Sequence, residues 1–342
     1  MIKYPKVNYI GNKEKVSEWI CDNLPIKNGT VLDLFCGGCS LSFELKKRNY
    51  KVISNDILYS NYSLAKAIIE NNNEKLMLDL TEKKLKKYFN KEIYENIRWM
   101  ENNLYFDYEV KELAMLINYS KNMEKYKKYI FLSLLRRAMI RKIPYSRMNI
   151  KWEEILKLRN EEYSYLKYKR RRAYHNKTFL YHILDNLENY NNSIFDNKKE
   201  NKAYQSDAIN LLKNTKEKID LVYIDPPYPS TMNKYNEFYG SFDKMLNKQK
   251  EYINYAKKNQ FLKYMKEIIK ISKNKINYAV ISLNNKSNPT AEDLKEDLKN
   301  EVVKIEILNK NHIYQITGKE NKKTNYEILI ICKLKEWILN GK

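Results

Sequence analysis

Short apolar runs alternate with longer stretches of helical spacing along the chain, and this alternation predicts the elements of an α/β fold. Residues 30–35 form a short apolar run that leads into a Gly-Gly turn, and Leu41–Lys47 then has the spacing of a helix. A second strand-like run, 51–55, ends at Asp56. The order of strand, glycine turn, helix and strand indicates a βαβ unit.

The strand pattern returns in the last third of the chain. Further strand-like runs are Ala203–Gln205, Ile219–Ile224, Tyr278–Leu283, Val302–Leu308 and Glu327–Cys332. A helix such as Gln260–Ile271 fits between them, and the polar stretch around Gly318 favours an antiparallel hairpin of the last two runs. The predicted strands therefore fall into two groups, 30–56 and 203–332.

The segment between these groups, about 95–200, is rich in Lys, Arg, Tyr and Leu at helical spacing and has no clear strand pattern. We interpret it as a helical insertion. The sequence then predicts two domains, one formed by 1–94 together with 201–342 and the other by 95–200. The chain has no evident internal repeat, and no Gly/Ser linker separates the two predicted domains.

The charge of the chain indicates the kind of partner that it binds. The 342 residues include 64 Lys+Arg and 42 Asp+Glu, for a formal net charge of +22, and such an excess favours a polyanion such as nucleic acid. Lysine is common in chains encoded by A/T-rich codons, so the positions of the arginines are the better indicator of a functional basic surface. Eight of the ten arginines lie between 136 and 172, and 121–180 has 18 Lys+Arg against 5 Asp+Glu. A solvated helix face remains the alternative for individual residues.

Several classes of protein are excluded by composition. No uninterrupted apolar stretch approaches the roughly 20 residues that span a bilayer, and four cysteines imply no disulfide framework, so we expect a cytoplasmic protein. Cys36 and Cys39 match a C-x-x-C redox motif or half of a zinc site. No second cysteine pair exists and the three histidines lack ligand spacing, so we predict no metal site and interpret these cysteines as turn and packing residues.

The turn after the first predicted strand has the chemistry of a cofactor site. Glycines at 37 and 38 let a ligand approach the backbone, and the following helix offers free N–H groups. Asp56 follows Gly37 by 19 residues at the tip of the second strand, where an acidic residue binds ribose hydroxyls. The pattern indicates a nucleoside-containing cofactor. An ordinary tight βα turn is the alternative.

The sharpest signal is Asp225-Pro226-Pro227-Tyr228, directly after a hydrophobic run. Two prolines fix the backbone and remove two donors, so the turn presents only acceptors, namely the Asp225 carboxylate and the Pro226 carbonyl. Acceptors that pull on the N–H bonds of a planar exocyclic amine free its lone pair, and the Tyr228 ring can hold the base by stacking. A Pro-Pro strand terminator with a chance Asp and Tyr is the alternative.

At these residues the chain resembles the Dam-like class of DNA adenine-N6 methyltransferases that use S-adenosylmethionine. The resemblance covers nearly the whole chain through four landmarks, Tyr9-Ile10-Gly11-Asn12-Lys13, Asp33-Leu34-Phe35-Cys36-Gly37-Gly38, Asp56 and Asp225-Pro226-Pro227-Tyr228. It implies a Rossmann-like methyltransferase fold, with a mostly parallel seven-stranded sheet, a C-terminal antiparallel hairpin and a helical insertion. The family pattern F-x-G-x-G has a glycine where this chain has Cys39.

The resemblance also implies roles for single residues. Tyr9 and Lys13 would contact the cofactor, Gly37 and Gly38 pass under it, Asp56 bind its ribose and Asp207 lie near its adenine. Asp225, Pro226 and Tyr228 would hold the target base. The implied cofactor set is Tyr9, Gly11, Lys13, Asp33, Phe35, Gly37, Gly38, Asp56 and Asp207, and the implied catalytic set is Asp225, Pro226, Pro227 and Tyr228. Without the family, 9–13 would be a surface loop.

The resemblance gives the basic insertion a role in target recognition, with double-stranded DNA as the partner and a flipped adenine as the substrate. The predicted DNA contacts are Arg136, Arg137, Arg141, Arg147, Lys169, Arg170, Arg171 and Arg172. Residues 230–240 are expected either to close over the base or to form a packed loop, and 312–323 to touch DNA. We expect a monomeric protein of a bacterium or phage that protects DNA from a cognate restriction endonuclease encoded nearby. We expect it to form no stable complex with that endonuclease and to bind no membrane.

Two other functions stay open at this point. Related Asp-Pro-Pro turns serve enzymes that methylate exocyclic amines of RNA, although such chains usually lack a large basic insertion. A non-catalytic nucleic-acid-binding protein that retains a methyltransferase shell is the second alternative. It predicts broken landmarks, whereas Asp33, Asp56, Asp225 and Tyr228 are all intact.

Overall fold

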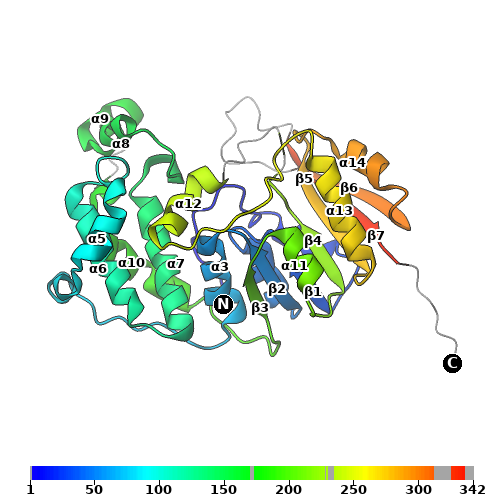
Figure 1. Ribbon diagram of the computed structural model, residues 1–342, viewed down its shortest axis with the longest axis horizontal. Coiled ribbons are helices and arrows are strands. Elements are labelled where there is room, and N and C mark those ends of the chain that lie inside the picture. The colour runs from blue at the N-terminus through cyan, green and yellow to red at the C-terminus, as the bar shows by residue number, and fades with distance from the viewer. Residues whose placement is uncertain (1, 170–172, 228, 230–234, 312–324, 336–342) are drawn as a thin grey trace. The chain divides into compact units, whose positions relative to one another are not determined.

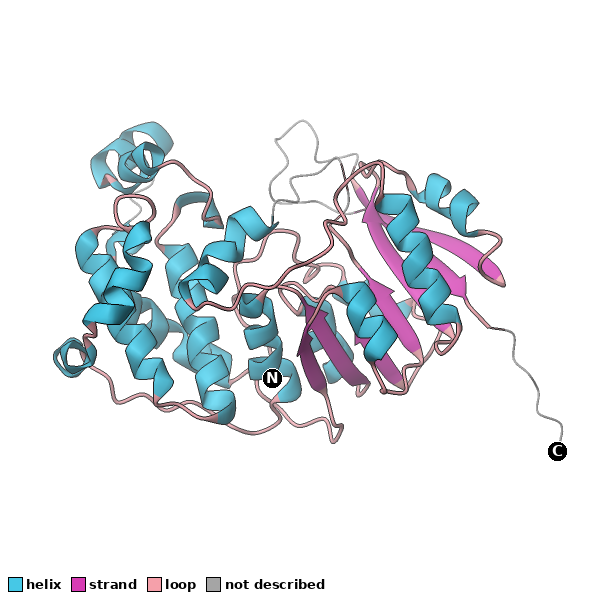
Figure 2. Ribbon diagram, viewed as in Figure 1, coloured by secondary structure: helices cyan, strands magenta, loops and turns pink. Residues whose placement is uncertain are grey.

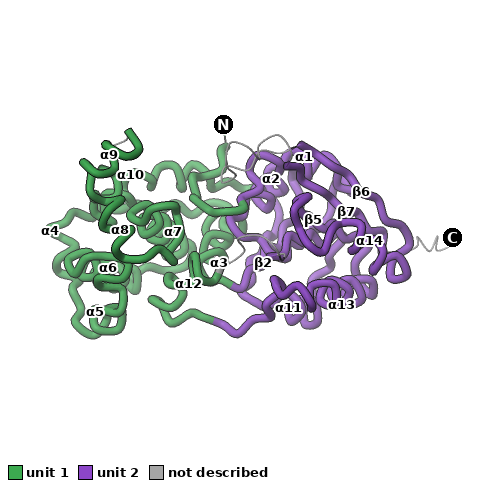
Figure 3. The backbone as a smooth tube through the Cα atoms, turned by 90° about the horizontal axis from the view of Figure 1, so that it is seen from above, with its two compact units in different colours: residues 1–11, 58–196, 235–249 green, residues 12–57, 197–234, 250–342 purple. Residues whose placement is uncertain are grey.

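The computed structural model describes residues 2–169, 173–227, 229, 235–311 and 325–335. Backbone contacts divide the chain into two compact units, green and purple in Figure 3. Unit 1 comprises Met1–Gly11, Leu58–Asp196 and Tyr235–Gln249, and unit 2 comprises Asn12–Ile57, Asn197–Lys234 and Lys250–Lys342. The division predicted from the strand and helix patterns of the sequence, 1–94 with 201–342 and 95–200, stays a prediction.

Unit 2 contains a seven-stranded sheet with the order β3-β2-β1-β4-β5-β7-β6. Its strands are β1 (Thr30–Asp33), β2 (Lys51–Asp56), β3 (Lys202–Gln205), β4 (Leu221–Ile224), β5 (Tyr278–Asn284), β6 (Lys304–Asn311) and β7 (Tyr326–Lys333). β1 to β5 pair in parallel, whereas β7 runs antiparallel to both β5 and β6. The predicted fold class, a mostly parallel α/β sheet with a C-terminal antiparallel pair, is confirmed (Figures 1 and 2).

Helices cover both faces of this sheet. In Figure 3, α1 (Ser17–Asp22) and α2 (Ser40–Lys47) lie on one face and α11 (Ala208–Asn214) and α13 (Phe261–Lys273) on the other. α14 (Ala291–Leu298) packs into the same core as α11 and α13. The buried residues of α13 are Phe261, Met265, Ile268, Ile269 and Ser272. Their spacing of three and four forms the apolar stripe that a helix needs to pack on a sheet.

The strands differ in burial as their places in the sheet require. All four residues of β4 are buried, which explains the continuous apolar run that precedes Asp225. β6 lies at one edge of the sheet and is only half-buried, with Lys304 and Glu306 exposed. Charged side chains on an edge discourage pairing with another chain.

Unit 1 is helical in its described residues, apart from an isolated bridge between Glu101 and Tyr105. Its α-helices are α3 (Tyr59–Ala65), α4 (Glu82–Leu85), α5 (Lys91–Ile97), α6 (Asp107–Lys121), α7 (Lys125–Arg141), α8 (Trp152–Arg159), α9 (Glu161–Tyr168), α10 (Phe179–Asn191) and α12 (Tyr235–Met245). Short 3₁₀ turns span Lys86–Tyr88, Arg98–Met100, Pro144–Ser146 and Ala173–Asn176, and a π turn spans Lys66–Glu70. Within the described ranges, no helix has both the length and the apolar character to cross a membrane.

α7 is the central helix of unit 1. It packs against α3, α6 and α10, and its residues from Ile130 to Ile140 are all buried. A helix that is buried on all sides belongs to the core of its unit. This position decides the surroundings of the arginines that α7 carries.

Candidate active site

The glycine turn and the end of β2 meet at one edge of the unit 2 sheet. β1 and β2 are parallel neighbours, so their carboxyl ends lie side by side. The turn is tight, because Cys36 N–H donates to Asn55 O at 2.8 Å and Cys39 N–H to Cys36 O at 2.7 Å. Gly37 has a φ of +49°, which suits a residue without a side chain. Its N–H donates to Asp56 Oδ2 at 2.9 Å and so joins the glycine turn to the predicted ribose-binding acid.

Asp33 lies at the end of β1 beneath this turn and is only 2% exposed. Ser42 Oγ, in the first turn of α2, donates to Asp33 Oδ2 at 2.6 Å. Burial raises the pKa of Asp33 to about 7, Asp225 and Asp56 push in the same direction, and the Ser42 hydrogen bond opposes them. Three carboxyl groups therefore influence one another at the carboxyl edge of the sheet.

The predicted adenine-side residue Asp207 is held by its own surroundings. Its carboxylate caps α11 by accepting from Ile209 N–H at 3.0 Å, and it also accepts from Tyr255 OH at 3.2 Å. The Tyr255 ring meets Phe35 edge to face, with centroids 5.2 Å apart. Tyr255 was not among the predicted site residues, although it supplies the aromatic surface between Phe35 and Asp207.

These residues fit a nucleoside-containing cofactor. The fit rests on three features of the structure: a glycine turn with positive φ, an acceptor at the tip of β2 beside it, and a half-buried aromatic ring at Phe35. Asn55 Oδ1 also lies buried at this edge with no hydrogen-bond partner among the described residues.

Asp225 follows β4 and forms an ion pair at the same edge of the sheet. Its Oδ1 lies 3.2 Å from Lys13 Nζ, and the same ammonium lies 2.7 Å from Glu327 Oε1 at the start of β7. Ser282 Oγ of β5 donates to that Glu327 oxygen. Burial raises the pKa of Asp225 to about 7, Lys13 opposes this shift and Glu327 adds to it. Glu327 and Ser282 were not predicted as site residues, and Lys13 was predicted only as a cofactor contact.

The rest of the catalytic turn is described in part. Pro226 is buried and Pro227 half-buried, whereas Tyr228 lies outside the described residues, as do 230–234 of the segment expected to close over the base. The predicted DNA contacts Arg170, Arg171 and Arg172 and residues 312–323 also lie outside the described ranges.

Tyr9 and Gly11 belong to unit 1. The Tyr9 ring stacks on Tyr239 of α12 with centroids 4.9 Å apart, and Ile10 N–H donates to Tyr239 OH at 2.8 Å. Gly11 has a φ of +82°, again a conformation that suits glycine. α12 therefore holds the segment that carries these two predicted cofactor residues.

Arg136 and Arg137, predicted as DNA contacts, are 2% and 5% exposed in the core helix α7. Arg136 Nη1 donates to Val7 O at 3.0 Å, and Arg137 Nε donates to Lys6 O. The Arg136 guanidinium also lies 4.8 Å from the Tyr239 ring centroid. Guanidiniums buried in this way are not presented to a phosphate backbone. We therefore leave both residues out of the DNA contacts proposed below.

The other described basic candidates are on or near the surface. Arg141 is half-buried and its guanidinium lies 4.1 Å from the Tyr174 ring. Arg147 is half-buried near Phe238, at 5.6 Å from that ring, and Lys169 is exposed after α9. These three side chains remain candidates for contact with DNA.

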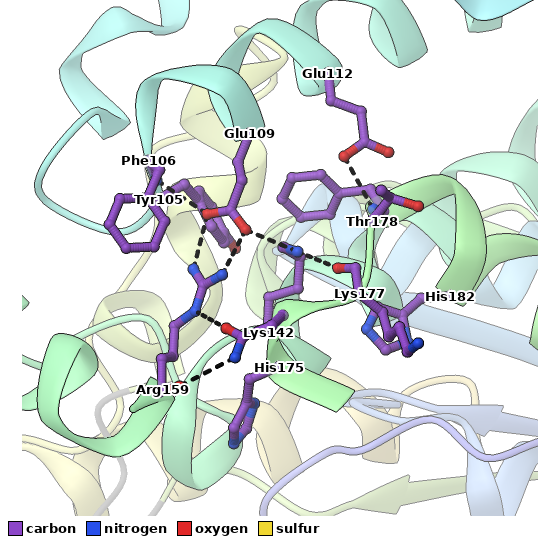
Figure 4. Close-up of polar contacts among 12 residues, drawn as sticks. Tyr105, Phe106, Glu109, Glu112, Lys142, Arg159, His175, Lys177, Thr178 and His182 are labelled. Carbon is purple, nitrogen blue, oxygen red and sulfur yellow. Dashed lines mark hydrogen bonds and ion pairs between the residues drawn. The ribbon is translucent and has the colours of Figure 1, made fainter. Parts of the chain in front are cut away.

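A second buried ion cluster lies in unit 1 (Figure 4). Arg159 of α8 makes a bidentate pair with Glu109 of α6, with distances of 2.8 and 2.7 Å, and Lys142 Nζ lies 2.8 Å from Glu109 Oε1. Burial opposes the charge of Glu109, but the Arg159 hydrogen bonds and the Lys142 charge outweigh it and hold the pKa of Glu109 below its usual value. Sequence reasoning assigned no role to this cluster, which fixes α8 to α6.

The cysteines and histidines among the described residues form no metal centre. Cys36 and Cys39 are buried with their sulfurs 3.6 Å apart, and burial raises the pKa of the Cys36 thiol. His175 Nδ1 and His182 Nε2 lie 2.7 and 2.8 Å from backbone carbonyls, and burial lowers the pKa of His182 to about 4. Across the described ranges, no group of three or more His, Cys, Asp or Glu is arranged to hold a metal ion.

Comparison with known proteins gives one family. A family model described as D12 class N6 adenine-specific DNA methyltransferase matches residues 9–294. The chain is 44% identical over 339 residues to Type II methyltransferase M2.HphI of Haemophilus parahaemolyticus, and the match covers 97% of this chain and 98% of that relative.

Two longer relatives match in part. The chain is 28% identical over 239 residues to Type II methyltransferase M.FokI of Planomicrobium okeanokoites, and 30% identical over 241 residues to Modification methylase StsI of Streptococcus sanguinis. These matches cover 65% and 66% of this chain, but only 33% and 34% of the two relatives.

Proposed function

Because the chain belongs to the family of D12 class N6 adenine-specific DNA methyltransferases, we propose that it methylates one adenine of a specific duplex sequence, with S-adenosylmethionine as the donor. The observation that carries this proposal is the placement of Asp225 at the carboxyl edge of the unit 2 sheet, where the glycine turn and Asp56 also lie. Open α/β sheets bind their ligands at this edge.

The cofactor would be held mainly by the residues of the β1 and β2 ends. Gly37 and Gly38 allow its close approach to the backbone, Asp56 accepts from its ribose, and Phe35 offers aromatic surface. S-adenosylmethionine, when bound, supplies an electrophilic methyl group. Lys13 is better assigned to Asp225 and Glu327 than to the cofactor, because both carboxylates lie within 3.2 Å of its ammonium.

The target adenine would be held by the catalytic turn. The Asp225 carboxylate and the Pro226 carbonyl accept from the two amine N–H bonds and so direct the nitrogen lone pair out of the ring plane. Pro226 and Pro227 offer no competing N–H donors. The sequence predicts that the Tyr228 ring stacks on the base. Catalysis is then mostly positioning of the amine in a site from which water is excluded.

DNA binding would use those residues of the basic segment that are not buried in the core of unit 1. We propose contacts from Arg141, Arg147 and Lys169, together with Arg170–Arg172, to the phosphates of a duplex. The adenine would leave the base stack to reach Asp225, at a cost of a few kcal/mol that pocket contacts offset.

The relatives' names suggest the biological setting. Two are called Type II methyltransferases and one a modification methylase. We propose that this chain likewise protects DNA from a restriction endonuclease encoded nearby, without a stable complex. It would act as a monomer, because one chain carries the catalytic turn, the glycine turn and the basic segment. Its DNA substrate requires a cytoplasmic location in a bacterial cell.

The test is single-molecule sequencing of DNA from a host that expresses the chain. We expect N6-methyladenine at one recognition motif, and none in a host that expresses Asp225→Ala. Asp79→Asn is the matched control, because the Asp79 side chain is 88% exposed and should leave the modification unchanged. The proposal would be overturned if DNA from the host that expresses the wild-type chain contained no N6-methyladenine, or if Asp225→Ala gave full modification.

A further inference from the structure

Glu327 is a fully buried carboxylate at the start of an apolar strand. It begins the run Glu327–Cys332 in β7, pairs with Asn284 of β5 and is 0% exposed. An ionised side chain in such a place is expensive unless a cation and further hydrogen bonds compensate it. Lys13 Nζ at 2.7 Å and the Ser282 hydroxyl supply this compensation. Glu327 also lies outside the range matched by the family model, 9–294.

The partner of Glu327 connects it to the catalytic turn. Lys13 Nζ lies 2.7 Å from Glu327 Oε1 and 3.2 Å from Asp225 Oδ1. Lys13 therefore makes its closer contact with Glu327 and its longer contact with Asp225. One ammonium shared by two carboxylates leaves a net negative charge in the array. Asp225 is thus oriented by Lys13 without being neutralised by it, as an acceptor for an amine requires.

We propose that Glu327 is a positioning residue of the methylation reaction, which holds Lys13 so that Lys13 orients the Asp225 carboxylate and leaves it free to accept from the target amine. This inference rests on the proposed function, because it assigns Asp225 the acceptor role. Glu327 itself would touch neither the target base nor the cofactor.

The charges that face Asp225 set the sign of the effect. Lys13 faces it from the N-terminal segment of unit 2, Glu327 from β7 and Asp33 from β1, and Tyr223 on β4 is uncharged because burial raises the pKa of its phenol. Burial raises the pKa of Asp225, Lys13 lowers it and Glu327 raises it. Loss of the Glu327 charge should therefore lower the pKa of Asp225, and loss of Lys13 should raise it.

The experiment is the pH profile of methylation by the full-length chain, with a DNA duplex that carries the recognition motif. Glu327→Gln keeps the shape and an acceptor for Lys13 but removes the charge. We expect the acid limb of kcat/KM to move to lower pH by about one unit, and the plateau rate at high pH to fall about tenfold because Lys13 then neutralises Asp225. Lys13→Met should move the limb in the opposite direction.

Two further variants complete the design. Glu306→Gln on the edge strand β6 removes one charge at a side chain that is 52% exposed, and it should reproduce the wild-type profile. Glu327→Asp keeps the charge but shortens the side chain. It should keep the limb near the wild-type pH and lower the plateau, which preserves the test if Glu327→Gln does not fold.

The outcomes separate the inference from the proposed function. A wild-type limb and plateau in folded Glu327→Gln, or a shift to higher pH, would overturn the role of Glu327 while leaving the methylation itself intact. Absence of N6-methyladenine in the wild-type reaction at every pH would instead overturn the proposed function. Circular dichroism and thermal melting of each variant report whether it is folded.

Discussion

The buried ion clusters around Glu109 in unit 1 and around Lys13 in unit 2 have opposite balances of charge. In unit 1, Glu109 meets two cations, Lys142 and Arg159, and its pKa is held below the ordinary value. In unit 2, one cation, Lys13, is shared by two carboxylates, Asp225 and Glu327, and the pKa of Asp225 is raised to about 7.

This difference separates a structural cluster from a chemical one. Each oxygen of Glu109 is engaged, since Oε1 meets Lys142 and Arg159 while Oε2 accepts from Arg159 and from Phe106 N–H. Such a carboxylate has no capacity left for a ligand. At the sheet edge of unit 2, in contrast, the excess of negative charge leaves a carboxylate that can accept a hydrogen bond from a ligand. Carboxyl groups with a pKa perturbed in this way are typical of functional sites.

The largest difference between the clusters is expected when the acid of each is replaced in turn and the free energy of unfolding is measured. Glu109→Gln leaves Lys142 and Arg159 buried without a counter-ion and should lower the free energy of unfolding by about 3–5 kcal/mol. Asp225→Asn removes a carboxylate that is costly to ionise, so it should leave the free energy of unfolding unchanged or raise it. Urea denaturation at pH 8 measures both.

Glu95→Gln is the control for this pair, because its side chain is 47% exposed and its removal should change stability by less than about 0.5 kcal/mol. If Asp225→Asn destabilised the protein as much as Glu109→Gln, the distinction between the two clusters would be lost.

The clusters should also respond to acid at different pH. The raised pKa of Asp225 means that its active, ionised form is lost below about pH 7, so kcat/KM should fall about tenfold per pH unit there. The lowered pKa of Glu109 means that its contribution to stability is present at neutral pH and is lost only as pH falls through that lowered value. At pH 6 the protein should therefore be folded but slow. Parallel activity and thermal-melting profiles check this, and coincident loss of both would contradict it.

A smaller effect is expected from replacing Arg136, and this replacement distinguishes an arginine buried in the core from those at the surface. Arg136 donates to Val7 O and lies beside the Tyr9 and Tyr239 rings. Because the sequence predicts Tyr9 as a cofactor contact, Arg136→Met should weaken S-adenosylmethionine binding about tenfold, equivalent to roughly 1.4 kcal/mol. Its affinity for DNA should stay within about twofold. Calorimetric titration with the cofactor, beside a DNA-binding assay, gives both numbers, and a loss confined to DNA would reverse the assignment.

The smallest effect is expected from a single proposed phosphate contact. Arg141→Gln should weaken duplex binding modestly and reduce the slope of log affinity against log salt by about 1. Arg98→Gln is the matched control, since the Arg98 side chain is 59% exposed in the short 3₁₀ turn Arg98–Met100. Equal salt slopes for Arg141→Gln and wild type would show that Arg141 does not contact phosphate.

The fold could be predicted from sequence because its signals are local. The central strands of the sheet follow from short apolar runs, and the run before Asp225 is buried on both faces of the sheet. The glycine turn and Asp56 lie within one βαβ unit, so their meeting also follows from a standard connection.

The ion clusters could not be predicted, because their members are distant in sequence. Lys13 and Glu327 are 314 positions apart and meet only because β7 inserts between β5 and β6. One signal was available, namely a single carboxylate at the head of the apolar run Glu327–Cys332. Arg136 and Arg137 carried a similar signal, since they lie inside the apolar run of α7 and such a position indicates burial.

The role of Asp225 is tested most directly by a single-turnover methylation reaction with an isotope-labelled methyl donor, followed by separation of the nucleosides. The wild-type chain should place the label on N6 of adenine, and Asp225→Asn should lower the rate by at least about a thousandfold while binding the duplex with unchanged affinity. Label on another base, or a wild-type rate from Asp225→Asn, would contradict the central claim that Asp225 is the acceptor that activates the adenine amine.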